Sequence, residues 1–195
     1  MVKKKSGYKK ICIIAVAVLL VTGYVIGFVH INSKFPKGSV DLIEPGQTKE
    51  INGFRWNSVK GELLTMDEIY EKYGYEDEAS DNHKNDFIYL VVWVEVQNMQ
   101  NTENKLEVMD FMGVNDTWSN GIDMYALWAL NGDDFDAVAA PQSTMRVGAL
   151  TAVDCKEAGR LINGKTEWKL RVTGWPQRNE FVVPVDISEG VNSLL

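Results

Sequence analysis

With 195 residues and a formal net charge of −7, the chain has room for one domain of ordinary size and a short appendage. Five lysines fall within the first ten residues, so the rest of the chain carries 15 basic and 27 acidic side chains. An acidic domain does not attract phosphate backbones, and we therefore expect no nucleic-acid partner. The two cysteines, Cys12 and Cys155, lie in an apolar run and in the domain that follows it, so the sequence does not describe a disulfide scaffold.

Residues 11–31 form an uninterrupted apolar run, ICIIAVAVLLVTGYVIGFVHI. A helix of this length spans about 31 Å, which matches the hydrocarbon core of a bilayer. A cleaved signal peptide is the alternative, but no small-residue cleavage site follows Leu20. Lysines that precede a span stay in the cytoplasm. We therefore predict a single-pass bacterial membrane protein with a cytoplasmic N-terminus and an extracellular C-terminal domain.

These observations divide the chain into four segments. We predict a cytoplasmic basic tail at residues 1–10, a membrane anchor at 11–31, a stalk at 32–46 and an extracytoplasmic β domain at 47–190. The stalk assignment rests on its turn-forming residues, which are Pro36, Gly38, Pro45 and Gly46. The domain is long enough to bury a core without a metal ion or a disulfide.

The domain opens with two short β segments within residues 48–59, on either side of the turn pair Asn52-Gly53. A short helix is predicted next. Thr65 and Glu68 have the spacing of a capping box, and Gly74 supplies a stop, so the helix covers residues 66–73.

Residues 87–98 predict the strongest strand, because apolar residues occupy every second position from Ile88 to Val96 and a mixed set fills the other face. Further strands are predicted at residues 106–112, 124–130, 144–153, 166–173 and 181–187. Pro184 places the last of them at a sheet edge. This pattern favours a mainly β fold, an immunoglobulin-like antiparallel β-sandwich with one short helical insert. Most of the six tryptophans are expected to serve packing.

Residues 159–166, GRLINGKT, fit the formula of a phosphate-binding loop. A true loop of this kind leads into a helix whose N-terminus receives the phosphates. Here the residues that follow alternate as in a strand. We therefore interpret Asn163-Gly164 as a hairpin turn and expect no nucleotide.

Three aspartates, Asp133, Asp134 and Asp136, could hold Ca²⁺, but their spacing misses the helix-loop-helix formula, and the sequence leaves calcium binding open. His83 and Cys155 are too few ligands for a zinc site. His83 is also the one histidine of the domain that could act as a catalytic base, and no nucleophile motif accompanies it. We therefore assign no catalytic, cofactor-binding or metal-ligating residue.

Several short motifs resemble a known family. They are Lys34-Phe35-Pro36, Asn52-Gly53-Phe54, Leu63-Leu64, the strand from Tyr89 to Asn98, the run Trp118-Ser119-Asn120-Gly121-Ile122-Asp123, and Pro141-Gln142-Ser143. With them the chain resembles the membrane-anchored domain-of-unknown-function family of Gram-positive bacteria (DUF 5028-like), which is related to the immunoglobulin-like domains of exported lipoproteins. The resemblance implies an immunoglobulin-like fold at the cell surface. It carries over no activity and no functional residues.

The sequence thus favours a non-catalytic binding module at the cell surface. Its expected partners are the lipid bilayer, through residues 11–31, and another protein or a cell-envelope component. An accessory or sensory subunit of a membrane complex, such as an export or peptide-resistance system, is the first alternative, and Gly23 and Gly27 in the span would then contact a partner helix. An extracytoplasmic hydrolase is the third possibility.

Overall fold

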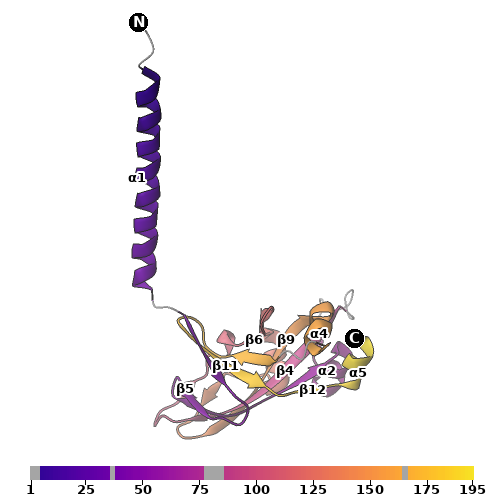
Figure 1. Ribbon diagram of the computed structural model, residues 1–195. Helices are drawn as coiled ribbons and strands as arrows, with labels where there is room; N and C mark the ends of the chain where they lie inside the picture. Colours follow the sequence, from indigo (N-terminus) through magenta and orange to yellow (C-terminus); the bar gives the residue numbers. More distant parts are fainter. Residues whose placement is uncertain (1–4, 36–37, 77–85, 164–166) are drawn as a thin grey trace. The chain divides into compact units, whose positions relative to one another are not determined.

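The computed structural model describes residues 5–35, 38–76, 86–163 and 167–195, and the chain divides into two compact units at Gly38 (Figure 1). The first unit contains helix α1 (Lys5–Lys34), which begins before the predicted anchor and ends after it. Within it, Lys10–Lys34 is long and apolar enough to cross a membrane. The second unit, Ser39–Leu195, contains every strand that the structure describes.

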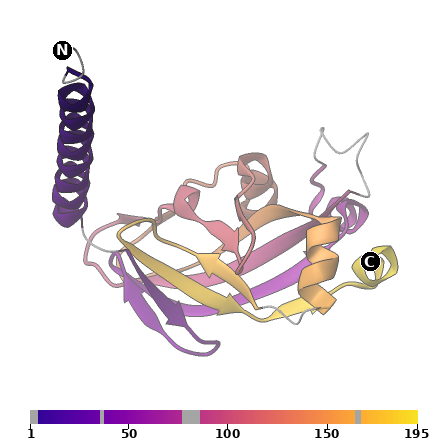
Figure 2. The ribbon, with the colours of Figure 1, turned by 45° about the horizontal axis from the view of Figure 1, so that its top comes forward.

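Two five-stranded sheets form the sandwich of the second unit (Figures 1 and 2). The first sheet has the order β1 (Ser39–Ile43), β11 (Gln177–Val183), β10 (Trp168–Arg171), β6 (Met112–Val114) and β7 (Ser119–Gly121). The second sheet has the order β12 (Val185–Ile187), β3 (Phe54–Leu64), β4 (Phe87–Asn98) and β9 (Thr144–Asp154), with β2 (Lys49–Ile51) also paired to β3. Strands β5 (Asn104–Lys105) and β8 (Val138–Ala139) form a separate pair. The mainly β sandwich predicted from the sequence is confirmed.

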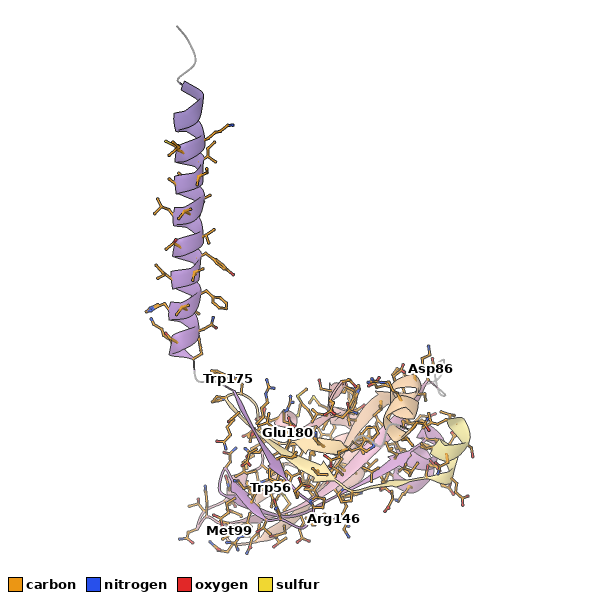
Figure 3. All side chains as sticks on the ribbon, viewed as in Figure 1. Trp56, Asp86, Met99, Arg146, Trp175 and Glu180 are labelled. Atoms are coloured by element: carbon orange, nitrogen blue, oxygen red, sulfur yellow. The ribbon has the colours of Figure 1, made fainter. Side chains whose placement is uncertain are left out.

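The two sheets pack face to face through a hydrophobic core. Trp56 of the second sheet, which is labelled in Figure 3, stacks on Phe181 of the first, with 5.1 Å between ring centroids, and its centroid lies 5.6 Å from that of Phe111. Two pairings are parallel, β1 with β11 and β12 with β3, and Figure 2 shows yellow β12 beside purple β3. The single strand predicted at residues 181–187 is in fact two strands of different sheets, and Pro184 lies between them. Strand β12 is at the edge of its sheet, but β11 lies between β1 and β10, so the edge position predicted from Pro184 holds only for the residues that follow it.

Strand β4 is the centre of the second sheet. Its residues from Ile88 to Val96 at every second position are buried in the core, as predicted. Part of its other face is covered as well, by helices α2 (Met66–Tyr73) and α3 (Met124–Asn131). The second buried cluster that results contains Leu64, Met66, Ile69, Tyr75, Tyr89, Val91, Ala126 and Leu150. The rest of this outer face remains open.

Helix α2 has the predicted bounds and caps. The Thr65 hydroxyl accepts a hydrogen bond from the Glu68 amide, and the Glu68 carboxylate accepts from the Thr65 amide at 2.8 Å. Gly74 ends the helix with a left-handed φ of 68°. The Glu68 carboxylate also accepts hydrogen bonds from Ser188 and Gly190, so the same residue joins α2 to helix α5 (Glu189–Leu194).

We expect Thr65→Ala to lower the free energy of unfolding by about 1 kcal/mol, because the cap of α2 loses its hydroxyl. Urea denaturation of the purified chain measures this loss. Thr65→Ser keeps the hydroxyl and is expected to stay within a few tenths of a kcal/mol of wild type. Equal losses in the two variants would mean that the hydroxyl does not stabilise the helix.

Two predicted strands are wrong. Residues 124–130 lie in helix α3, because the Asp123 carboxylate accepts hydrogen bonds from the amides of Tyr125 and Ala126 and starts a helix there. Residues 106–112 contain a short 3₁₀ turn, η2 (Val108–Asp110), and only the first residue of β6.

The predicted stalk and the predicted hairpin also differ from the structure. Strand β1 lies inside residues 32–46, and Ile43 enters the core opposite Phe181, so the folded unit begins at Ser39. Asn163 ends helix α4 (Cys155–Asn163), which Asp154 caps by accepting from the Lys156 amide at 2.9 Å, so a helix and not a strand precedes Gly164. Residues 164–166 lie outside the described residues, as does His83. The strand predicted after them is confirmed as β10. A helix before residues 164–166 and a strand after them is the reverse of the order in a phosphate-binding site, where the strand comes first and the helix follows.

Candidate functional site

The open part of the outer face of the second sheet holds a group of polar and aromatic side chains in two cross-strand rows. Lys60 of β3 lies opposite Trp93 of β4, which lies opposite Gly148 of β9. In the next row, Ser58 lies opposite Glu95, which lies opposite Arg146. Residues that lie opposite each other on one sheet face come within reach of each other's side chains, so the two rows form one continuous surface.

The last turn of α2 forms one wall of this surface. Lys72 and Tyr73 both donate hydrogen bonds to the carboxylate of Glu62, which stands on β3 beside Lys60. Burial by itself would raise the pKa of Glu62, but the hydrogen bonds from Lys72, Tyr73 and Trp93 outweigh it and hold the pKa below its usual value. Glu62 therefore stays ionised and fixes the wall to the sheet.

Trp93 is the central side chain of the surface. Its ring lies over Gly148: a Cβ atom on that glycine would come within 2.7 Å of Trp93 Cζ3. The guanidinium of Arg146, which is labelled in Figure 3, stacks 4.3 Å from the centroid of the ring, and the Tyr73 ring centroid lies 6.1 Å from it. The missing side chain at position 148 thus makes room for the indole, and its neighbours hold it in place.

These side chains line a pocket of about 650 Å³, a size typical of small-molecule sites. Its lining residues are Ser58, Lys60, Gly61, Glu62, Lys72, Tyr73, Trp93, Val94, Glu95, Arg146 and Asp186. Lys60, Glu95 and Asp186 are exposed and form no ion pair with any residue that the structure describes. The pocket therefore presents charged groups of both signs whose hydrogen-bonding capacity is available to a ligand.

The lowered pKa of Glu62 gives a prediction for stability against pH. A depressed carboxyl pKa contributes stability that is present above the ordinary value and is lost as pH falls through the lowered one. We therefore expect the stability difference between wild type and Glu62→Gln to be larger at neutral pH than at about pH 3. Urea denaturation at several pH values measures this difference. Tyr73→Phe removes one hydrogen-bond donor to Glu62 and should remove part of this pH dependence. If the stability difference between wild type and Glu62→Gln does not change with pH, the pKa of Glu62 is not lowered in the folded protein.

The sequence indicated other residues as candidate ligands, namely the three aspartates of a possible calcium site. Asp136 accepts a hydrogen bond from the Val138 amide at 3.1 Å, and Asp133 and Asp134 are exposed beside it. In the part of the chain that the structure describes, no group of three His, Cys, Asp or Glu residues could hold a metal ion. The pocket residues were missed. The one available indication was the mixed outer face of residues 87–98, which includes Trp93 and Glu95.

Comparison with known proteins finds similarity in the three-dimensional fold only, and none in sequence. No family model and no curated protein sequence matches the chain. An uncharacterized β-sandwich protein from Clostridium difficile is 10% identical, with a TM-score of 0.45, over 75% of this chain and 96% of its own. A conserved hypothetical protein from Bacillus anthracis is 12% identical, with a TM-score of 0.42, over 66% and 87%.

A lipoprotein candidate of Bacillus subtilis, ycdA, is 14% identical, with a TM-score of 0.42, and the match covers 75% of this chain and 41% of ycdA. The assignment of the fold rests on the strand pairing and the core of the chain itself. The resemblance to the DUF 5028-like family remains a prediction.

Proposed function

We propose that this protein is a membrane-anchored, extracytoplasmic binding protein whose β-sandwich holds its ligand in the pocket between α2 and strands β3, β4 and β9. The observation that carries the proposal is the arrangement around Trp93. The indole is held by Gly148, Arg146 and Tyr73, while Lys60 and Glu95 beside it make no ion pair with a described residue. A positioned aromatic ring amid uncommitted polar groups is what a binding site requires.

Binding rather than catalysis is the better use of this pocket. Among the described residues that line it, none is a histidine or a cysteine. Its half-buried carboxylate, Glu62, has a lowered pKa because of three donors, and a carboxyl held ionised in this way does not serve as a general acid near neutral pH.

Membrane anchorage is supported by Lys10–Lys34, which is long and apolar enough to cross a bilayer, and by the five lysines that precede its apolar run. We expect a protease added outside intact cells to digest residues 39–195 and to leave the N-terminus protected. Immunoblots against tags at the two ends measure this. A mature protein that begins after residue 31, or a C-terminal tag that survives the protease, would contradict the proposed topology.

The binding proposal is tested by sedimentation of the full-length chain, in lipid nanodiscs, with cell envelopes isolated from a Gram-positive bacterium. The pocket variant Lys60→Ala/Glu95→Ala removes one cation and one anion, so the net charge does not change. Glu103→Ala/Lys105→Ala does the same on an exposed segment away from the pocket and is the matched control. We expect about tenfold weaker binding for the pocket variant and wild-type binding for the control. Equal binding of the two variants, or no binding by wild type, would refute the proposal.

A further inference from the structure

The charges of the pocket balance locally. Lys72 is paired with Glu62, which leaves the cations Lys60 and Arg146 and the anions Glu95 and Asp186. Glu95 lies directly opposite Arg146 and one row from Lys60, so opposite charges alternate at about the spacing of neighbouring strands. A polyanion would be repelled by the carboxylates next to each cation that attracts it, and a polycation would be repelled by the cations next to each carboxylate. The pocket is therefore unsuited to a ligand of high net charge.

The same groups provide hydrogen-bond donors and acceptors side by side. Lys60 and Arg146 only donate, and the carboxylates of Glu95 and Asp186 only accept. A hydroxyl group both donates and accepts, so a ligand with several hydroxyls can bind to both kinds of group at once. Such charge-assisted hydrogen bonds are stronger than those between neutral groups.

Trp93 also lines the pocket and is half-buried, so the part of its ring that Arg146, Gly148 and Tyr73 leave uncovered adds an apolar surface among these polar groups. A pyranose ring has the matching chemistry, because its C–H bonds form an apolar face and its hydroxyls form a polar rim. The aromatic ring with alternating donors and acceptors around it fits such a ring better than a purely apolar or an ionic ligand.

We propose that the pocket binds a neutral saccharide, with a sugar ring against Trp93 and its hydroxyls hydrogen-bonded to Lys60, Glu95 and Asp186. This inference rests on the proposed binding function and names its ligand class. A short peptide with both terminal charges is the competing ligand. The structure favours the saccharide because each charged group of the pocket has a neighbour of opposite sign that offsets its electric field. Such a surface interacts more favourably with dipolar hydroxyl groups than with the two separate full charges of a peptide.

The test is calorimetric titration of the full-length chain in lipid nanodiscs, without sugar-headed detergent. The probes are tetramers of N-acetylglucosamine, glucose and xylose, with trialanine as the competing ligand. We expect at least one tetrasaccharide to bind saturably, and its affinity to change by less than about threefold between about 50 and 500 mM NaCl because the ligand has no charge. Trp93→Leu should weaken this binding at least about tenfold. Trp128→Leu, which changes an exposed tryptophan on α3, should not.

Lys60→Ala/Glu95→Ala provides a second variant in case Trp93→Leu does not fold, and it should weaken saccharide binding by a similar factor. Two results overturn the inference. One is that no tetrasaccharide binds at about 10 mM. The other is that saccharide binding is unaffected in both pocket variants. If envelope binding still depends on the pocket in either case, the proposed function stands and only the ligand class fails. If envelope binding is also independent of the pocket, both fail.

Discussion

Asn98→Asp is expected to lower the free energy of unfolding by about 3 kcal/mol or more, although the two side chains have almost the same shape. Asn98 is fully buried at the end of β4. Its amide nitrogen lies 2.8 Å from the carbonyl oxygen of Thr102, 3.1 Å from that of Ala139 and 3.0 Å from that of Ala140. A carboxylate would place a charged acceptor against three acceptors, and an unpaired buried charge costs several kcal/mol.

Asn115→Asp is the matched control, because at Asn115 the amide oxygen makes the hydrogen bonds. It accepts from the amides of Thr117 and Trp118 at 2.9 and 3.1 Å, while the buried amide nitrogen has no partner among the described residues. A carboxylate keeps both acceptor contacts. We expect a change below about 1 kcal/mol, measured with Asn98→Asp in the same urea titrations. If Asn98→Asp and Asn115→Asp lower the free energy of unfolding equally, the three carbonyl groups around Asn98 are not the cause of the destabilisation.

The parts of the fold that could be predicted are those that local chemistry determines. Helix α2 has its capping box and its terminal glycine within ten residues, so its bounds follow from the sequence. Asn52 and Gly53 have φ values of 51° and 81°, the two left-handed residues of a type I′ turn, and the hairpin of β2 and β3 forms there. In strand β4, apolar residues occupy every second position from Ile88 to Val96, and this alternation determines which face of the strand enters the core.

Helix α3 was missed because its apolar residues fit a helix and a strand about equally well, and the Asp123 cap, although local, was not recognised. A long-range contact supports the helix at its other end. The Asn131 side chain at its end donates to the carbonyl of Gly148 at 2.8 Å and accepts from the Gly148 amide at 2.8 Å. The helix thereby satisfies the backbone at the edge of β9. A contact of this kind depends on residues that are distant in sequence and leaves no local pattern.

The pocket could not be predicted for a related reason. Lys60, Trp93 and Arg146 come from three strands, and only the register between those strands brings them together. Alternation along β4 indicates that Trp93 and Glu95 share a face, but it does not indicate what lies opposite them. The charges of these residues are common on exposed strand faces, so composition does not distinguish a pocket from an ordinary solvated surface.

Gly148→Ala is expected to destabilise the domain by about 1–3 kcal/mol and to abolish ligand binding in the pocket. The added Cβ would lie 2.7 Å from Trp93 Cζ3, 2.8 Å from Trp93 Cη2 and 3.1 Å from the Cβ of Leu130, so the indole must move. Gly121→Ala is the control. It also lies in a strand, nothing lies within 4 Å of its added Cβ, and we expect a change within about 0.5 kcal/mol.

A double-mutant cycle shows whether Trp93 is the group that requires glycine at position 148. In a Trp93→Leu background the smaller side chain leaves room for the new methyl group, so Gly148→Ala should cost at least about 1 kcal/mol less than it does in wild type. Urea denaturation of the four proteins gives this coupling energy. An unchanged cost would assign the clash to Leu130 on α3, and Gly148 would then support the helix and not the indole. If the coupling energy has the expected sign, Gly148 is required for the pocket, because only a residue without a side chain at this position lets the Trp93 indole lie where it does.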